Sequence, residues 1–511
     1  MNHSAKNVVK KTVAIFLLLS SAHSVWAQTT GVDAVSAASS GQSEEKTETE
    51  QKKRGGQAKV PSAKKPVQPT KAEIDDAANR ENSKSDNYEQ KVRDTFLYGL
   101  ESEISDQIDT LKNADDKRFV NEIYNLFQTT ESNSIKEKVL VYFTALKDPC
   151  LEDYAVTVVN DPFDVKKNLV DAVFKYISAV KCSAASPALV SLMEDEHEDY
   201  IDGALSALGD VGGEEEAQFL ADYLDKDDLS SGRRQELMKA LGKLKATSTW
   251  AKLRDVLEDE NENSYVRMYA AEALGAMGES ASVEILAEQY RTVSDANLRV
   301  YLIKGLSYFK DSEAQNIILQ AIRDSFYKVR LEAIETVKKQ EIKAAVPFLV
   351  YRAKNDAEAV VKNACYPVIA LLNTSEGNEY LVGVITDKKS GDTTKANVAA
   401  ALLKEGHTGA KEIAELAIEC NKNDVHKQLR YALGKEMAKY SNGDFARACT
   451  VYLESKDVST QGTGLDMWAK GRYGECKSAV EKIADSTDGK KKPSAMALKA
   501  MRLLGRETPK D

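Results

Sequence analysis

Apolar and polar residues follow a helical period along most of this chain of 511 residues. The clearest stretch is residues 266–278, with the sequence VRMYAAEALGAMG. Its apolar side chains recur at i, i+3, i+4, i+7, i+8 and i+11, which places them on one face of an α-helix: Val266, Tyr269, Ala270, Ala273, Leu274 and Met277. Gly275 and Gly278 indicate the end of this helix, because glycine tolerates the left-handed backbone found at helix C-termini.

The same pattern returns every 30 to 35 residues, in step with the pair Val266-Arg267. The equivalent pairs are Ile135-Lys136, Val165-Lys166, Tyr200-Ile201, Arg233-Arg234, Leu298-Arg299, Val329-Arg330, Val361-Lys362, Thr394-Lys395 and Val425-His426. A short Gly/Ser/Asp turn and a second amphipathic run follow each, as in residues 282–290, 314–322 and 346–353. We therefore predict an all-α fold, an α-solenoid of about twelve stacked two-helix repeats. Because the register resets at every turn, a coiled coil is excluded.

The motif V-R-x-x-A-A-x-A-L-G-x-x-G at 266–278, with weaker copies at 298–306 and 329–337, resembles HEAT repeats. The resemblance is to the short type found in phycobilisome lyases, here in an exported bacterial member, and it covers residues 130–440 well. It implies that the basic residue at the second position pairs with an acidic residue at a repeat junction. Arg330 after Asp324 and Lys362 after Asp356 fit that structural role. The motif specifies the fold and says little about function.

Residues 1–27 have the pattern of a secretory signal peptide. Lys6, Lys10 and Lys11 precede a short apolar run, and Ala27 offers a small residue before a mature start at Gln28. The apolar run is too short for a good membrane span. We therefore expect an exported protein, in the periplasm or cell envelope of a bacterium, without a transmembrane segment in the mature chain. A buried N-terminal helix is the alternative.

Residues 28–88 are rich in Ser, Thr, Gln, Glu, Lys, Gly and Pro and contain few large apolar side chains. Such a segment cannot offset the entropy cost of ordering, so we predict a disordered polar linker that is dispensable for folding. Its basic, proline-containing part around Pro61, Pro66 and Pro69 is either a solvated spacer or a contact for anionic lipid or cell-wall polymer.

The helical pattern covers residues 89–509, with a regular core at about 130–440. Residues 96–111 and 119–127 predict a longer helix pair that caps the N-terminal end. Near the C-terminus, Gly462, Gly464, Gly471 and Gly474 interrupt the pattern, which predicts looser repeats there.

The formal net charge is −10, and removal of the signal, which carries three Lys and no acidic residue, gives −13. This balance argues against nucleic acid as the main partner, because nucleic acid requires a basic face. The six cysteines contain no Cys-x-x-Cys pair, so no zinc ribbon or redox motif is indicated. Free buried thiols are the preferred interpretation, although pairing in an exported chain stays open.

Beyond the signal, only three histidines remain: His197, His407 and His426. Deoxyhypusine hydroxylase has a similar architecture and binds two iron ions through several His-Glu dipeptides, whereas this chain has one, His197-Glu198. Serine-hydrolase, zinc-protease and phosphate-loop motifs are absent from the sequence. We predict no catalytic residues, no cofactor-binding residues and no metal ligands, and hence no enzyme.

The remaining feature is a stripe on the second helices, which the resemblance places on the concave, default binding face. Counting from each Val position, residues +20 and +24 are apolar and predicted to be buried, so +22 and +25 point outward. This stripe runs from acidic to basic and ends at the candidate partner-binding residues Arg291, Arg323, Tyr351 and Lys354. An ordinary solvated helix face would show such charge runs too.

The sequence thus predicts a non-catalytic exported scaffold that binds a protein or peptide partner through the solenoid surface. Two alternatives stay open. One is an enzyme, or the accessory subunit of one, of the lyase or hydroxylase type with HEAT repeats. The other is a peripheral envelope protein that binds cell wall or lipid through the basic linker.

Overall fold

The computed structural model describes residues 65–71, 73, 88–486 and 493–507. The predicted signal peptide and most of the polar linker therefore lie outside the described residues. Within them the chain is almost entirely helical, which confirms the predicted α-solenoid.

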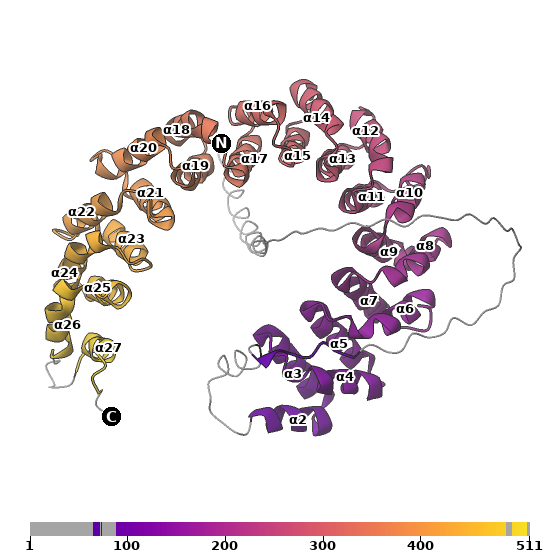
Figure 1. Ribbon diagram of the computed structural model, residues 1–511, viewed down its shortest axis with the longest axis horizontal. Coiled ribbons are helices and arrows are strands. Elements are labelled where there is room, and N and C mark those ends of the chain that lie inside the picture. Colours follow the sequence, from indigo (N-terminus) through magenta and orange to yellow (C-terminus); the bar gives the residue numbers. More distant parts are fainter. Residues whose placement is uncertain (1–64, 72, 74–87, 487–492, 508–511) are drawn as a thin grey trace, which may run out of the picture. The chain divides into compact units, whose positions relative to one another are not determined.

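The helices form two layers, one of odd-numbered and one of even-numbered helices (Figure 1). The odd layer holds α3 (Glu101–Ala114), α5 (Asn133–Leu146), α7 (Lys167–Val180), α9 (Glu198–Val211), α11 (Ser231–Leu244), α13 (Ser264–Met277), α15 (Ala296–Leu306), α17 (Tyr327–Gln340), α19 (Ala359–Leu372), α21 (Asp392–Glu405), α23 (Lys427–Met437), α25 (Val458–Gly471) and α27 (Ala495–Leu503).

The even layer holds α2 (Tyr88–Tyr98), α4 (Val120–Thr129), α6 (Glu152–Asn160), α8 (Ser186–Glu194), α10 (Glu214–Tyr223), α12 (Trp250–Glu258), α14 (Ala281–Thr292), α16 (Ser312–Ala321), α18 (Val346–Asn355), α20 (Ser375–Thr386), α22 (Ala410–Cys420), α24 (Ala446–Leu453) and α26 (Lys477–Ala484). Short 3-10 helices lead into several of these: η1 (Pro149–Leu151), η2 (Ser183–Ala185), η3 (Thr247–Thr249), η4 (Lys343–Ala345), η5 (Gly443–Phe445) and η6 (Gly474–Cys476).

The motif helix 266–278 is α13, and its apolar face is buried as predicted, apart from the half-buried Tyr269. It ends at Gly278, whose φ of 79° lies in the left-handed region. The predicted second runs are α14, α16 and α18. Positions +20 and +24 are buried, and positions +22 and +25 are exposed, in the repeats that end with these three helices. In these repeats, the helical period therefore correctly predicted which side chains of the second helices are buried and which are exposed.

Both ends differ from the prediction. The N-terminal run 96–111 is not one long helix, because the chain breaks between α2 and α3 at Gly99 and Leu100, and α3 has the same 14-residue length as α5. At the other end, α25 runs uninterrupted through Gly462 and Gly464. A Cβ on Gly464 would lie 2.8 Å from the backbone nitrogen of Leu453, so this glycine allows a close helix approach rather than loosening the repeat.

Small residues bring neighbouring odd-numbered helices into backbone contact. A Cβ on Gly275 of α13 would lie only 2.3 Å from the carbonyl oxygen of Gly305 in α15, and one on Gly242 of α11 would lie 2.8 Å from the Cβ of Ala273. The facing helices α14, α16 and α18 are instead separated by a hollow of about 540 Å³. Neighbouring odd-numbered helices of these repeats are therefore in closer contact than the neighbouring even-numbered ones.

Ion pairs of buried or half-buried residues link successive repeats. Arg299 pairs with Asp324 at 2.9 Å, and Arg330 pairs with Asp356 at 2.6 Å. Arg330 also donates to the backbone oxygen of Asp324 at 2.9 Å. Arg330 thus contacts the backbone of Asp324 at the turn before its own helix and the carboxylate of Asp356 at the next turn between repeats. The predicted structural role, pairing with an acidic residue at a repeat junction, is therefore seen for Arg330. Lys362 forms no ion pair among the described residues.

All six cysteines are buried, and none of them forms a disulfide. Burial raises the pKa of the Cys365 thiol to about 12 and that of Cys420 to about 11. These thiols are therefore protonated and shielded, which agrees with the preferred interpretation of the sequence.

Candidate functional site

The three helices that carry the candidate residues lie side by side in the even layer. Each buries one apolar face against the odd layer, through Leu286 in α14, Ile318 in α16 and Leu349 in α18. The opposite faces are left to solvent, and the hollow of about 540 Å³ lies between them. We call this hollow the even-layer groove; its lining residues are Arg291, Ser312, Glu313, Asn316, Leu319, Gln320, Arg323 and Phe348.

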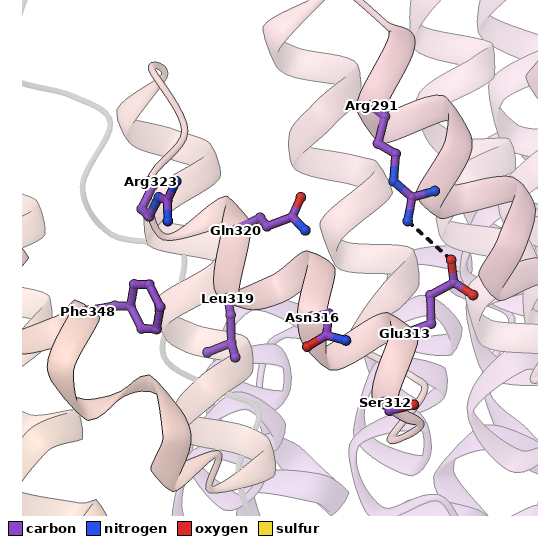
Figure 2. Close-up of a pocket in the computed structure, with 8 residues that line it drawn as sticks. All are labelled: Arg291, Ser312, Glu313, Asn316, Leu319, Gln320, Arg323 and Phe348. Atoms are coloured by element: carbon purple, nitrogen blue, oxygen red, sulfur yellow. Dashed lines mark hydrogen bonds and ion pairs between the residues drawn. The ribbon is translucent and has the colours of Figure 1, made fainter.

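Two of the four candidate residues, Arg291 and Arg323, line this groove (Figure 2). Arg291 comes from the last turn of α14, and Arg323 follows the end of α16. In the view of Figure 2 they stand on either side of Gln320. Both side chains are exposed, so their guanidinium groups are available to a ligand at modest desolvation cost.

The two arginines differ in what they already contact. Arg291 pairs with Glu313 at 3.2 Å, and both side chains are about half exposed. Such an exposed pair is weak, so a stronger acidic ligand can replace Glu313 at little cost. Arg323 has no ion pair among the described residues and is the free cation of the groove.

The floor and walls add other kinds of contact. Leu319 and Phe348 supply apolar surface, while Asn316 and Gln320 supply amide groups that both donate and accept hydrogen bonds. The groove therefore combines cationic ends, peptide-like polar groups and an aromatic ring, which suits an extended polypeptide better than a compact apolar ligand.

Tyr351 and Lys354 do not line the groove. Both are exposed on α18, Tyr351 with 57% of its surface accessible. The Lys354 ammonium lies 5.0 Å from the centre of the Tyr380 ring, and Arg352 lies over Tyr351 at 5.4 Å. Lys354 and Tyr351 therefore add a cation and an aromatic ring to the exposed surface of α18, outside the groove. The aromatic residue inside it is Phe348, which sequence reasoning missed because it lies one turn before Tyr351, outside the +22/+25 stripe.

A second hollow of about 440 Å³ lies on the odd layer, between α15, α17 and α19. Its lining is largely apolar and includes Val300, Leu331 and Pro367, with Glu332 among them. Burial raises the pKa of Glu332, and nearby Lys304 partly counters this. Lys328 and Lys338 also line this hollow together with Glu335, and, unlike the even-layer groove, it has no amide side chain in its lining.

No cluster of three or more His, Cys, Asp or Glu side chains that could hold a metal ion occurs among the described residues. His426 bonds Asp392 at 2.9 Å on the surface, and the ring of His197 packs edge-on against Phe163. Neither histidine stands beside a nucleophile in these contacts. Over the same described ranges, no helix has the length and apolar character needed to cross a membrane.

A family model described as spirochaete HEAT repeat protein matches residues 96–503. No curated protein matches the sequence. Among solved structures, a Kap121p mutant shares 11% identity over 84% of this chain and 58% of its own, with a TM-score of 0.40. Importin beta shares 11% identity over 84% of this chain and 70% of its own, also with a TM-score of 0.40.

The CpcE–CpcF complex of phycocyanin lyase from Nostoc sp. PCC7120 is a further similar structure. It shares 17% identity over 46% of this chain and 92% of its own, with a TM-score of 0.27. The chain thus spans little more than half the length of the Kap121p mutant and nearly the full length of the lyase chain.

Proposed function

Because the chain belongs to the spirochaete HEAT repeat proteins, we propose that it is a non-catalytic scaffold that binds an extended acidic segment of a partner protein. The proposed binding site is the even-layer groove. HEAT solenoids are typical of protein-binding scaffolds, since stacked repeats present long continuous surfaces. We extend the proposal to a location in the bacterial envelope, which the signal-like sequence of residues 1–27 supports.

The observation that carries the proposal is the charge of the groove. Arg323 has no ion pair among the described residues, and Arg291 has only the half-exposed Glu313. Carboxylates of a partner can form two-pronged hydrogen bonds to both guanidinium groups, an arrangement for which arginine is well suited. Phe348 offers a hydrophobic anchor point between successive partner residues. Tyr351 and Lys354 then continue the contact along α18.

The enzyme alternative receives less support. A lyase-related protein is among the similar structures, yet the described residues include no cluster of side chains that could hold a metal ion. The linker alternative depends on residues outside the described ranges.

The test uses two fluorescent peptides of equal length, one containing alternating Glu and aromatic residues and one with Lys in place of Glu. We expect the acidic peptide to bind the purified full chain and the basic one not to bind. Reversing both cations, Arg291→Glu with Arg323→Glu, should weaken acidic-peptide binding by tenfold or more, since central arginines are frequent hot spots. Fluorescence anisotropy measures both affinities.

The matched control reverses two exposed lysines away from the groove, Lys388→Glu with Lys389→Glu, and should change the affinity by less than about threefold. Thermal unfolding should be nearly the same for all variants, because exposed pairs contribute under about 1 kcal/mol. Equal binding of both peptides, or equal loss in the control, contradicts the assignment. Crosslinking in intact cells then identifies the natural partner and shows whether it is an envelope protein.

A further inference from the structure

A short part of the polar segment lies against the first repeats. Residues 65–70 belong to no helix or strand, and residues 71 and 73 are helical. Pro66 is buried although it belongs to a segment that the sequence marks as a solvated linker. Within the predicted polar linker of residues 28–88, this described part therefore contacts the first repeats.

The central contact is between the backbone and a buried carboxylate. The N–H of Val67 donates to Oδ2 of Asp148 at 2.7 Å, across 81 positions of sequence. Asp148 is 4% exposed, and its other oxygen accepts the N–H of Cys150 at 3.0 Å. Its backbone oxygen accepts the hydroxyl of Tyr176 at 2.6 Å. The carboxylate is thus fixed by the folded repeats, with Oδ2 directed at the segment.

Side chains on α4 and just before it complete the site. Gln68 and Asn121 exchange two amide hydrogen bonds of 2.9 and 3.0 Å, a pairing that requires one orientation of the segment. Glu73 accepts the Lys117 ammonium at 2.5 Å, and that hydrogen bond lowers the pKa of Glu73 to about 2. The first repeats therefore bind the segment through its backbone at Val67, its side-chain amide at Gln68 and its carboxylate at Glu73.

The segment is suited to such binding by its own sequence. Pro66 and Pro69 have restricted φ angles, and each proline also keeps the residue before it extended. A segment that is already extended loses little entropy when it docks, which is why proline-spaced peptides make efficient ligands. Without it, Oδ2 of Asp148 would be a buried charged oxygen that lacks this donor, which is costly.

We propose that Asn121, Lys117 and Asp148 form a binding site for an extended, proline-spaced peptide, and that residues 65–71 and Glu73 of this chain occupy it as an intramolecular ligand. This site lies in the first repeats and does not depend on the even-layer groove. It anchors the polar segment to the solenoid, and any competing peptide must displace that segment.

The first test removes the N–H donor of Val67 from the docked segment and changes no residue of the repeats. Val67→Pro deletes the N–H that Asp148 accepts, while Val67→Ala keeps it, and the Val67 side chain is itself 63% exposed. In the full chain, we expect trypsin to cleave after Lys71 about tenfold faster in Val67→Pro than in wild type or Val67→Ala. Equal cleavage rates in the three proteins would refute the docked state.

A second measurement asks whether the site accepts a peptide in trans. The probe is a fluorescent peptide of residues 62–75, with its Val67→Pro form as the matched control. We expect the probe to bind the Val67→Pro chain about tenfold more tightly than wild type, whose tethered segment competes at high effective concentration. The control peptide should bind neither chain.

Receptor-side variants verify the location of the site. Asp148→Asn keeps an oxygen for Cys150 and replaces Oδ2 by an amide that cannot accept the Val67 N–H, so it should abolish probe binding. Asn121→Ala, on the surface, should weaken it. Probe binding that is equal in wild type and Val67→Pro, or that survives Asp148→Asn, overturns the proposal.

Discussion

At the scale of single residues, this solenoid contains buried charges that pair with charges of a neighbouring repeat. Asp356 is 2% exposed and Arg330 is 6% exposed, and they meet at 2.6 Å between α17 and α18–α19. Burial acts to raise the pKa of Asp356, but hydrogen bonds from Arg330 and from the Glu358 N–H outweigh it, so the pKa lies below the usual 3.8. The folded state therefore prefers the charged carboxylate.

This preference predicts a pH-dependent effect of Asp356→Asn. A carboxyl group whose pKa is lowered by folding stabilises the protein above its unfolded-state pKa, and this contribution is lost as the pH falls through the folded-state value. At pH 7 the variant should lose roughly 3 kcal/mol, since it leaves Arg330 buried without its counter-charge. Below about pH 4 the difference from wild type should shrink.

Thermal unfolding followed by circular dichroism at pH 7, 5 and 3 measures this difference. The control is Glu335→Gln, which removes an exposed partner of Lys338 and should cost less than about 1 kcal/mol at any pH. A loss in Asp356→Asn that stays constant with pH would mean that packing, and not charge, is responsible.

At the scale of helices, the spacing of the layers is set by a few small residues. Gly275 and Gly305 let α13 and α15 touch backbone to backbone. Helices in contact through larger side chains normally lie 8–10 Å apart, so this pair is unusually close. The close odd layer leaves the even layer wider, and the groove lined by Arg291 and Arg323 lies there. A packing feature of one layer thus shapes the candidate site on the other.

The element-scale prediction compares two glycine-to-alanine substitutions within helices. Gly275→Ala places a Cβ 2.3 Å from the backbone of Gly305, which cannot move without separating the helices, so we expect a loss of about 2 kcal/mol or more. Gly383→Ala in α20 meets no atom within 4 Å and should be neutral or stabilise by up to about 1 kcal/mol.

Urea unfolding of both variants provides the measurement. Acidic-peptide binding, measured for the same two variants, tests whether the helix spacing affects the even-layer groove. Gly275→Ala should alter the affinity for the peptide, whereas Gly383→Ala should not. Equal stability of the two variants would show that the helices can separate without strain.

At the scale of the whole molecule, each repeat is supported only by its two neighbours. Stability in such an array is a sum of local terms, so the terminal repeats, with one neighbour each, are the weakest. The helices reflect this. Only Ala497 and Ala500 are buried in the last helix, α27, whereas nine of the 14 residues of α13 are buried.

We therefore expect amide hydrogen exchange of the native protein to proceed from the C-terminal end inward. Amides of α27 should exchange at least tenfold faster than those of α13, α15 and α17. Exchange detected by mass spectrometry on the full chain resolves these helices. Uniform rates across the array would instead indicate a single cooperative unit.

The sequence by itself determined the helices, the repeat length, the buried positions and the outward direction of Arg291, Arg323, Tyr351 and Lys354. These properties depend on a period of about 3.6 residues and on turn residues, which are local and can be read along the chain. The match of the family model to residues 96–503 agrees with that reading.

Only the tertiary structure decided what depends on distances between helices. It placed Phe348 beside Arg323, paired Arg291 with Glu313, and made the even layer the wider one. It also docked Val67 on Asp148, 81 residues away. A composition poor in apolar side chains predicts that a segment cannot fold alone, but a buried carboxylate elsewhere can still bind its backbone. Such contacts join residues whose separation in sequence carries no periodic signal, so no pattern along the chain could show them.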